Sequence, residues 1–260
     1  FLGTGTSHGV PSIDCMRTNY AHCPKDVCRS SIHDKKHQRT RSSILIQNEQ
    51  GALLVDVSAD FRYQMLREAI KNVDAVLLTH NHSDHIGGIP DIRSYTTEKT
   101  LTLYGSSETI ESVKQSYRYI FDPSTFAGGG IPKLELSEIT GPFTLCGLDI
   151  TPISVKHGSL NGALGFRISD LAYIPDIKSI ADSELEKVKG VKILILNCLR
   201  VSPLHSTHLT MAESIALART IGPEKCYFIH MCHDIHYKHD SVNLDPWMTF
   251  SYDGLTIEIN

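Results

Sequence analysis

Three histidines and one aspartate are packed into residues 80–85, which read HNHSDH and directly follow an apolar run typical of a β-strand. Imidazole nitrogens and carboxylate oxygens at this density suit a divalent transition metal. His80 and His82 can point toward one ion, whereas Asp84 and His85 begin the next turn and can face a second ion nearby. The motif therefore predicts part of a dinuclear metal centre.

Two metal ions need more ligands than one motif supplies, and three downstream residues have a suitable type and placement. Each lies at or just beyond the carboxyl end of an apolar run, where the loops of a sheet converge on a site. A single histidine or aspartate in such a place is usually a turn residue. Beside the motif, however, they complete a set of candidate ligands: His157 after residues 153–155, Asp176 after residues 171–174 and His230 after residues 226–229.

The composition also favours metal chemistry. The chain has 14 histidines in 260 residues, more than twice the average usage of ~2%. Its 7 cysteines are an odd number in a chain too large to need disulfide bonds, so we expect reduced thiols and a cytoplasmic location. The net charge of −4 argues against a general polyanion-binding surface, and nucleic acid is therefore not an expected partner. No apolar run approaches the roughly 18 residues that a membrane span needs.

Short apolar runs and helical patterns follow one another along the chain and predict an α/β fold. Strands are expected at residues 43–47, 52–57, 75–79, 101–104, 143–155, 164–168, 171–174, 192–196, 225–229 and 255–259. Helices are expected at residues 61–71, 106–116, 179–189 and 211–221. Because each half places strands before helices, we expect a two-sheet core with helices outside, in a single domain over residues 1–260. The chain begins within a predicted strand, so we expect the natural protein to extend ahead of Phe1.

Two segments depart from this pattern. Residues 14–42 are polar, rich in Cys, His, Lys and Arg, and too long for an ordinary loop inside a compact domain. We expect a bound metal to organise this insertion. Residues 117–132 place aromatic side chains ahead of the glycine run 128–130 and predict a lid or a dimer contact, which makes a homodimer a candidate assembly.

Residues 79–88, THNHSDHIGG, resemble the signature of the metallo-β-lactamase fold superfamily, the four-layered αββα metallohydrolases. The resemblance covers the whole chain, because the later ligands appear in the family's order. It implies two divalent ions with a hydroxide held between them as the nucleophile. Five imidazoles and two carboxylates suit zinc, manganese or iron, and we expect zinc or manganese. The resemblance also implies the ligand sets: His80, His82 and His157 for one ion, Asp84, His85 and His230 for the other, and Asp176 bridging both.

More specific similarity lies outside this motif. Residues 3–11, the early cysteines and residues 39–43 resemble the branch of PhnP-like cyclic phosphodiesterases. In that branch three N-terminal cysteines and a late histidine hold a structural zinc ion, and such a set forms a closed tetrahedral site. The cysteines here follow a C-x7-C-x4-C spacing instead of the branch's C-x-C-x2-C, which leaves His22 and Cys232 as alternative ligands. The ligands implied by the resemblance are Cys15, Cys23, Cys28 and His233.

A catalytic proton donor is also needed, because a phosphodiester releases a poor alkoxide leaving group. His208 lies just ahead of the predicted helix 211–221 and matches the branch's catalytic histidine in its distance from that helix. His205 is the nearby alternative. We predict His208 as the proton donor and count Asp84 with it among the catalytic residues.

The leading hypothesis is a dinuclear metal-dependent hydrolase that cleaves small or cyclic phosphate esters. Two adjacent cations can ionise a bridging water and hold the oxygens of a phosphoryl group during in-line displacement. Three alternatives stay open: a tRNA 3′ processing endonuclease with the same metal core, a thioester or other hydrolase, and a metal-binding accessory protein with little turnover. The negative net charge and the lack of a long basic insertion disfavour the tRNA nuclease.

Overall fold

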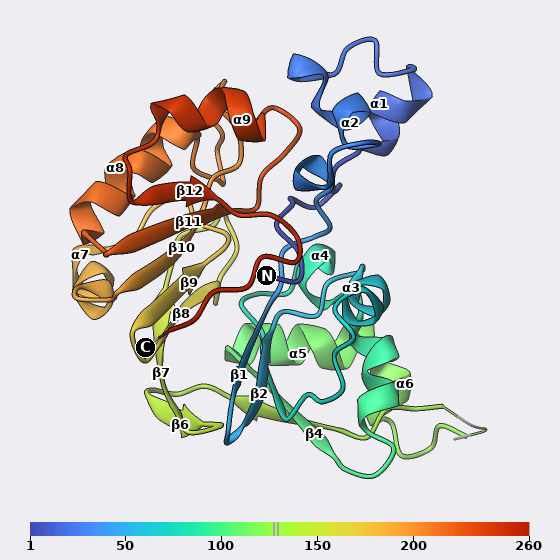
Figure 1. Cartoon of the computed structure of the whole chain (residues 1–260). Coiled ribbons are helices and arrows are strands. Elements are labelled where there is room, and N and C mark those ends of the chain that lie inside the picture. The colour runs from blue at the N-terminus through green and yellow to red at the C-terminus, as the bar shows by residue number, and fades with distance from the viewer. Residues whose placement is uncertain (127, 129, 260) are drawn as a thin grey trace.

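The computed structural model describes residues 1–126, 128 and 130–259. Two β-sheets lie face to face, and helices cover their outer faces (Figure 1). One sheet has five strands in the order β1-β2-β3-β4-β5, and the other has seven in the order β12-β11-β10-β9-β8-β7-β6. The four-layered αββα arrangement expected from the sequence is therefore confirmed.

Most strands of both sheets pair in parallel with their neighbours. The first sheet comprises β1 (Ile44–Asn48), β2 (Gly51–Val55), β3 (Ala75–Leu77), β4 (Leu101–Gly105) and β5 (Leu134–Glu138). The second comprises β6 (Phe143–Leu145), β7 (Leu148–Ser154), β8 (Leu164–Ile168), β9 (Leu171–Ile174), β10 (Ile193–Asn197), β11 (Lys225–Ile229) and β12 (Met248–Phe250). Strands β2 to β5 pair in parallel, and so do β9 to β12. Their carboxyl ends consequently meet at a common edge of each sheet.

Most helices are short. The first half contains α3 (Phe61–Arg67), α4 (Ser83–Ile86), α5 (Ser107–Ser116) and α6 (Arg118–Phe121). The second half contains α7 (Asp182–Leu185), α8 (Met211–Ile221) and α9 (Tyr237–Asp240). Short 3-10 turns span Pro24–Asp26, Lys35–His37, Ile89–Tyr95, Glu186–Val188 and Ser241–Asn243. No helix in the described part of the chain has the length and apolar character needed to cross a bilayer.

The central layer of the core lies between the two sheets, because alternate side chains of a strand point to opposite faces. In β2, Leu53 and Val55 face the other sheet, whereas Leu54 packs under the helices of the first half. In β10, Ile195 faces the first sheet, and Leu194 packs under the helices of the second half. A strand buried on both faces reads as one continuous apolar run, which explains why these strands could be recognised in the sequence.

Several of the expected elements differ in the structure: the strand expected at the start of the chain is absent, and the helix expected at 61–71 ends at Arg67. The expected strand 143–155 is a hairpin of β6 and β7 that turns at Cys146 and Gly147, with φ values of 50° and 68°. Positive φ at both central residues is the geometry of the tight turn that joins adjacent antiparallel strands. The described residues 255–259 do not form the expected strand, and the helix expected at 179–189 is reduced to α7 and a 3-10 turn. Strands β5 and β12 were not expected from the sequence.

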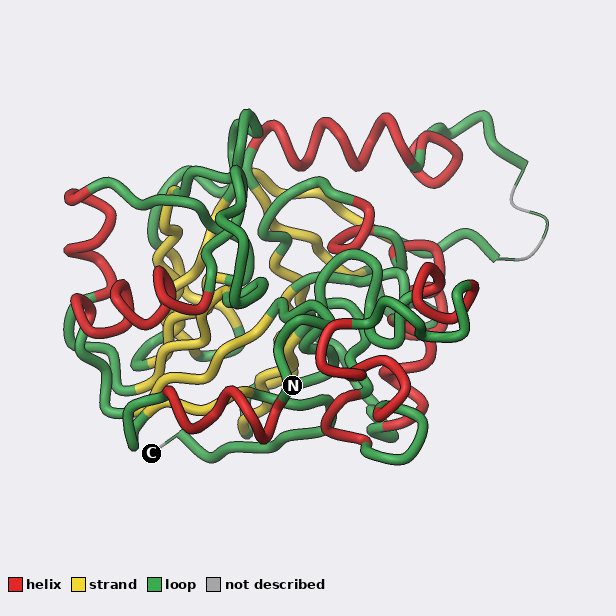
Figure 2. The backbone as a smooth tube through the Cα atoms, turned by 90° about the horizontal axis from the view of Figure 1, so that it is seen from above, coloured by secondary structure: helices red, strands yellow, loops and turns green. Residues whose placement is uncertain are grey.

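Both unusual segments lie outside the sandwich. The N-terminal insertion, with α1 (Ile13–Arg17) and α2 (Val27–Ser30), projects as a lobe at the upper right of Figure 1. From α5 the chain continues through α6 and extends away from the sheets (Figure 2), and the Phe126 side chain is 92% exposed. Ala127 and Gly129, within the predicted lid or dimer segment 117–132, lie outside the described residues. The lid or dimer role stays a prediction.

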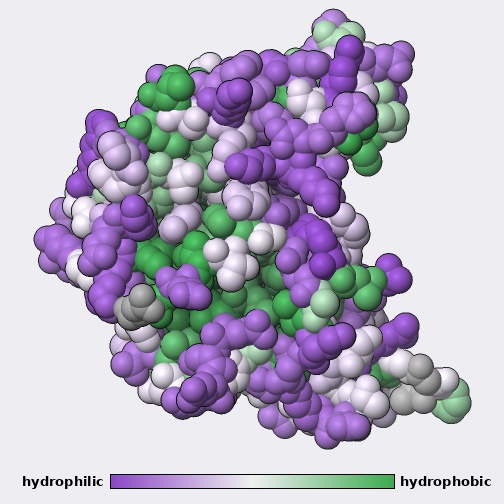
Figure 3. Space-filling view, viewed as in Figure 1, coloured by the Kyte–Doolittle hydropathy of each residue, from purple (hydrophilic) through white to green (hydrophobic). Residues whose placement is uncertain are grey.

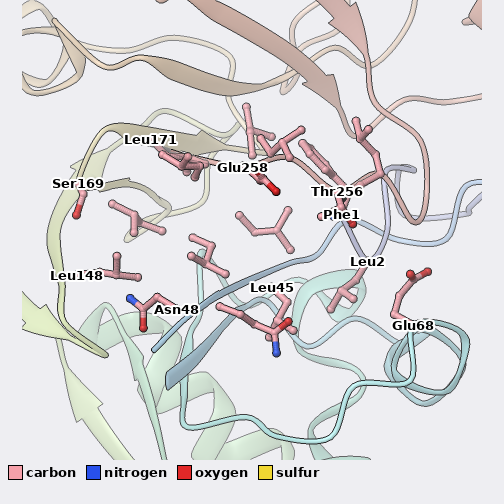
Figure 4. Close-up of a pocket in the computed structure, with 18 of the residues that line it drawn as sticks. Phe1, Leu2, Leu45, Asn48, Glu68, Leu148, Ser169, Leu171, Thr256 and Glu258 are labelled. Atoms are coloured by element: carbon pink, nitrogen blue, oxygen red, sulfur yellow. Dashed lines mark hydrogen bonds between the residues drawn. The ribbon is translucent and has the colours of Figure 1, made fainter. Parts of the chain in front are cut away.

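A large groove of the described surface lies apart from the candidate metal ligands. About 780 Å³ in volume, it opens between β1 and residues 254–259. Apolar side chains gather in the middle of this face (Figure 3), and Leu45, Leu148 and Leu171 line the groove (Figure 4). None of the candidate metal ligands is among the described residues that line it. The reactive groups meet instead at the strand ends.

Candidate metal centre

The HNHSDH motif forms the turn from β3 into α4. His82 is the N-cap residue of α4 and has an extended backbone with φ −67° and ψ 147°, so His80 and His82 precede the helix. Asp84 and His85 lie within the first turn of α4. The two halves of the motif belong to different donor groups in the structure, as their spacing predicted.

The first donor group unites His80, His82, His157 and Asp176. The Nε2 atom of His80 lies 3.0 Å from Nδ1 of His82, and Nε2 of His157 lies 3.3 Å from the same Nδ1 atom. His157 follows β7 and Asp176 follows β9, so the folding of the second sheet brings both to the motif. Three imidazoles thus converge on one point beside a carboxylate.

The second donor group unites Asp84, His85 and His230. The Oδ2 atom of Asp84 lies 3.4 Å from Nε2 of His85 and 3.6 Å from Nε2 of His230. His230 follows β11 directly and has a positive φ of 62°. This left-handed conformation is uncommon for a residue with a Cβ atom, and its occurrence at a site is typical of a functional constraint.

Asp176 lies between the two groups. Its Oδ1 atom is 3.3 Å from Nε2 of His85 and 3.2 Å from Nε2 of His230. Its Oδ2 atom is 3.8 Å from Nε2 of His80 and 3.5 Å from Nε2 of His157. Each carboxylate oxygen therefore faces a different donor group, which is the placement expected of a bridging ligand.

The donor set fits divalent cations. Four buried atoms at its centre have no hydrogen-bond partner among the described residues: Nε2 of His85, Oδ1 of Asp176, and Nδ1 and Nε2 of His230. Buried polar atoms without a partner are costly and rare, and a bound cation would remove this cost. Imidazole nitrogens and carboxylate oxygens that converge within 4.8 Å of one another match the coordination chemistry of zinc and of neighbouring first-row metals.

The electrostatics of the centre favour bound positive charge. Burial alone would lower the pKa of His85, but the carboxylates of Asp176, Asp84 and Asp56 raise this pKa well above its ordinary value. Burial and the neighbouring His85 lower the pKa of His80 well below its ordinary value, so the His80 imidazole is neutral, as a metal ligand must be. The three carboxylates thus create a negative potential that a cation would neutralise.

Asp56 is a buried supporting residue that the sequence did not single out. Its Oδ2 atom lies 2.7 Å from Nδ1 of His85, and its Oδ1 atom accepts hydrogen bonds from the backbone amide and the hydroxyl of Thr79. The hydroxyl oxygen of Thr79 also lies 3.0 Å from Nδ1 of His80. Asp56 and Thr79 therefore hold the imidazoles of His85 and His80 with Nε2 toward the centre.

Replacing Asp56 with asparagine is expected to weaken metal affinity at the centre by about 10- to 100-fold, because loss of a supporting carboxylate typically has an effect of this size. Competition with a chromophoric chelator measures this affinity. The matched control is Asp91→Asn, which removes an exposed carboxylate from the turn after α4. Equal affinities in wild type and Asp56→Asn would contradict the supporting role.

His208 lies beside both donor groups of the centre. Its ring centroid is 4.7 Å from those of His157 and His230, and its Nδ1 atom is 3.8 Å from Oδ2 of Asp176. Burial and the neighbouring His230 lower the pKa of His208 to about 2, so its imidazole is neutral near pH 7. A neutral imidazole can donate a hydrogen bond from one of its two ring nitrogens.

Asn197, at the end of β10, fixes which nitrogen of His208 carries the proton. The Oδ1 atom of Asn197 accepts a hydrogen bond from the amide of Leu209, so its Nδ2 group is free to donate to Pro175 O and, at 3.2 Å, to Nδ1 of His208. With Nδ1 accepting, the proton of His208 lies on Nε2. His205 lies one ring further out, 5.2 Å from the His208 ring, and its Nδ1 atom accepts from the Thr207 amide.

The N-terminal lobe contains a separate donor group, Cys15, Cys23, Cys28 and His233. The Nδ1 atom of His233 lies 3.0 Å from Sγ of Cys15 and 3.4 Å from Sγ of Cys28. The alternatives His22 and Cys232 are not members of this group. Because His233 follows the centre's His230 closely, a metal here would tie the lobe to the loop that carries His230.

Replacing Cys28 with serine is expected to lower the zinc content by one equivalent and to expose the lobe to proteolysis, because this insertion has few apolar contacts of its own. Elemental analysis and limited proteolysis with trypsin measure the two effects. The matched control is Cys146→Ser, in the β6-β7 turn far from the donor group in sequence. Unchanged zinc content in Cys28→Ser would contradict the assignment.

A model of the beta-lactamase superfamily domain matches residues 52–231, which include the motif and every later ligand of the centre. A crystal structure of a diphosphatase from the PhnP family superimposes over 100% of this chain and 96% of its own, with a TM-score of 0.87 and 32% sequence identity. The chain belongs to the metallo-β-lactamase superfamily, in its PhnP-like branch.

Two further proteins are similar to this chain. A Porphyromonas gingivalis protein named octanoyltransferase is 37% identical over 98% of this chain, and the chain spans 50% of that protein's length. The Zn²⁺-bound PqqB structure from Methylobacterium extorquens has a TM-score of 0.79 and 20% identity, covering 99% of this chain and 98% of its own. The PqqB likeness shows a shared fold, and only part of the octanoyltransferase corresponds to this chain.

Proposed function

We propose that this metallo-β-lactamase fold protein is a dinuclear metal-dependent phosphodiesterase that cleaves small or cyclic phosphate esters. The observation that carries the proposal is the position of Asp176, whose two carboxylate oxygens face different donor groups. The likeness to a PhnP-family diphosphatase supports chemistry at phosphorus. Zinc and manganese are the proposed metals at the centre, and zinc is proposed for the cysteine group.

The candidate ligands can be assigned to two metal ions. His80, His82 and His157 would hold one ion, Asp84, His85 and His230 the other, and Asp176 both. When bound, two neighbouring divalent cations supply Lewis acidity and an activated water for phosphoryl transfer. The ligands would also fix the position of the substrate phosphate, because all of them except the exposed His82 are buried, and hydrogen-bonding partners hold the imidazoles of His80 and His85.

His208 is proposed to stabilise the leaving oxygen. Because Nδ1 of His208 accepts from Asn197, Nε2 is the nitrogen that would donate to a substrate oxygen. A donor held in place before the reaction stabilises negative charge as it develops in the transition state. We therefore propose that His208 donates a hydrogen bond as a neutral imidazole, in place of the proton donation predicted from the sequence, and we prefer it to His205 for this role.

A thioester hydrolase is the second candidate, and one observation favours it. The Porphyromonas gingivalis relative is named octanoyltransferase, and octanoyl groups are commonly carried as thioesters. The same donor set would serve attack on a carbonyl carbon, with His208 donating to the developing oxyanion. The phosphodiesterase is preferred because the PhnP-family structure matches essentially its whole chain to this one, whereas half of the octanoyltransferase lies outside the match.

The discriminating experiment is a substrate panel on metal-reconstituted protein. The panel contains bis-p-nitrophenyl phosphate, a 2′,3′-cyclic nucleotide, a ribose cyclic phosphate, precursor tRNA and an octanoyl thioester. We expect turnover of the phosphodiesters and slow or no cleavage of the tRNA and the thioester. Turnover confined to the thioester would overturn the proposal in favour of the second candidate.

A further inference from the structure

Arg39 is a buried arginine in the neck, residues 5–10 and 39–41, that joins the N-terminal lobe to the sandwich (Figure 1). Its side chain is only 1% exposed and is among the largest fully buried side chains of the described chain. The Arg39 amide donates to Val10 O at 2.9 Å, and the Val10 amide donates to Arg39 O at 2.8 Å. A Cβ atom at Gly5 would lie 2.9 Å from Cβ of Arg39, so a glycine is needed for this close packing. The neck therefore encloses Arg39 on purposeful contacts of its backbone.

The Arg39 guanidinium holds the loop that connects the metal centre to the cysteine group. Its Nη1 group donates to Cys232 O at 2.7 Å, and its Nη2 group donates to Ile235 O at 2.8 Å. His233, a member of the cysteine group, lies between these two carbonyls in the sequence, and His230 of the metal centre lies just ahead of them. One planar side chain thus fixes the backbone on both sides of His233.

His230 depends on its backbone for its position. Both of its ring nitrogens lack a hydrogen-bond partner among the described residues, whereas Nδ1 of His85 lies 2.7 Å from the Asp56 carboxylate. The backbone of His230 also has a positive φ of 62°. The contact of Arg39 with Cys232 O, two residues further along, is therefore one of the contacts that hold this imidazole in place.

The buried charge of Arg39 has no carboxylate as an ion-pair partner in the described part of the chain. The guanidinium donates to the two neutral carbonyls, and its Nε atom has no partner among the described residues. Burial lowers the pKa of Arg39 to about 10, which still leaves the side chain charged near pH 7. A buried charge without a counter-charge is costly. We therefore expect another source of negative charge close to Arg39.

The cysteine group can supply that negative charge. Zinc binds cysteine as the thiolate, so a zinc ion held by three thiolates and one neutral imidazole would carry one net negative charge. The Cys28 thiol of this group lies close enough to Arg39 to interact with its charge. Two amides also point at these sulfurs: the Ser12 amide donates to Sγ of Cys28 at 3.4 Å, and the Cys28 amide donates to Sγ of Cys23 at 3.1 Å. Arg39 adds a full positive charge to these partial ones.

We propose that Arg39 is the counter-charge of the zinc-loaded cysteine group and that it is a positioning residue for His230, because it holds the loop that joins His230 to His233. The proposal rests on the zinc site proposed for the cysteine group, and it does not depend on which ester the metal centre cleaves. Arg39 contacts the backbone of the loop, so it would act on the metal centre through that loop.

Two metal probes report on the two sites separately in the full chain. Thiolates that bind Co²⁺ produce an intense charge-transfer absorption, which the histidine centre cannot produce because it has no cysteine ligand. Mn²⁺ prefers carboxylate ligands to thiolates, so loss of the EPR signal of free Mn²⁺ measures binding at the histidine centre. Metal-stripped wild type, Arg39→Met and Arg39→Lys are titrated with each probe. The matched control is Arg17→Met, which removes an exposed arginine from the last turn of α1.

Arg39→Met should weaken Co²⁺ binding at the cysteine group about 10- to 100-fold, the usual effect of losing a supporting group beside metal ligands. Arg39→Lys should bind Co²⁺ within about threefold of wild type, because lysine keeps the positive charge. Both variants should weaken Mn²⁺ binding at the histidine centre about 10-fold, because neither has the planar fork that holds the Cys232 and Ile235 carbonyls together. Arg17→Met should match wild type with both probes.

Other outcomes overturn the proposal in distinguishable ways. Equal losses of Co²⁺ affinity in Arg39→Met and Arg39→Lys would show a structural role in place of the counter-charge. Wild-type Mn²⁺ binding in Arg39→Lys would overturn the positioning role, and wild-type binding of both probes in Arg39→Met would overturn both roles. If Arg39→Met does not fold, Arg39→Lys alone decides, since it should lose Mn²⁺ affinity and keep Co²⁺ affinity. Wild type without a charge-transfer band would overturn the zinc site itself, and the counter-charge with it.

Discussion

Replacing Asp176 with alanine is expected to lower kcat about 1000-fold or more and to reduce metal binding at the centre. The Asp176 carboxylate faces both donor groups, with its oxygens 3.2 to 3.8 Å from four different imidazoles. Its loss removes a shared ligand and leaves several buried nitrogens without a partner. Interactions with a catalytic metal contribute several kcal/mol to transition-state stabilisation, and each 1.4 kcal/mol corresponds to about a factor of ten in rate.

Steady-state kinetics and elemental analysis of the same preparation measure this effect. Asp176→Asn separates charge from shape, because asparagine keeps the volume of the side chain but loses its negative charge, and we expect it to resemble Asp176→Ala. The control is Asp182→Asn, in the exposed first turn of α7. An Asp176→Ala protein that keeps its metal content and more than a tenth of wild-type kcat would contradict the bridging role.

His208→Ala is expected to have the second largest effect, a loss of kcat of about 100- to 1000-fold with unchanged metal content. This range is typical for removal of one donor that stabilises transition-state charge. His208 lies beside Asp176 and against the rings of His157 and His230, but the other side chains still supply a complete donor set without it. We therefore expect His208→Ala to lower kcat and to leave metal binding unchanged.

His205→Ala is the matched comparison, because it removes an imidazole from the same loop that lies one ring further from the centre. We expect it to change kcat less than threefold. If His208→Ala kept the wild-type rate while His205→Ala abolished turnover, the donor role would move to His205. If His208→Ala lost metal, His208 would be a ligand, as its proximity to Asp176 and His230 allows.

The sequence predicts the layers of this fold well because its buried strands leave local patterns. Leu194 and Ile195 pack on opposite faces of β10, and a strand buried on both faces is a continuous apolar run. The capping box at the start of α8 is equally local: the Thr210 amide donates to the carboxylate of Glu213, a near neighbour in the chain, at 2.8 Å. The edge strand β12 was missed because its three residues are too few to show a period.

The candidate site was predictable where its residues are close in sequence or follow a strand. The motif at 80–85 is recognisable because it has three histidines and one aspartate in six residues. The other three ligands, His157, Asp176 and His230, are recognisable because each follows a strand. Asp56 also follows a strand, β2, and that placement was the available signal. Asp56 has no histidine close to it in the sequence, so it could not be recognised as part of a metal site. Its contact with His85 exists only after β2 and β3 have paired.

The pocket of about 410 Å³ beside His82 and His157 could not be predicted from the sequence. Three of its lining residues, Glu108, Asn161 and Thr207, are separated by tens of residues in the sequence. Each is a polar residue of a type that is common on protein surfaces. Only the close approach at Gly158 and Gly162 brings them together, and glycine is common in loops of every kind because it tolerates turns of either hand. The shape of such a pocket depends on long-range packing, so the structure reveals it and local sequence patterns do not.

The most direct test of the dinuclear centre is anomalous X-ray scattering, combined with elemental analysis, on crystals of protein purified without chelators. We expect two neighbouring peaks, one among His80, His82 and His157 and one among Asp84, His85 and His230, with the Asp176 carboxylate between them. We expect a further peak at the cysteine group in the N-terminal lobe. An absence of ions among the histidines, even after incubation with zinc or manganese, would contradict this account.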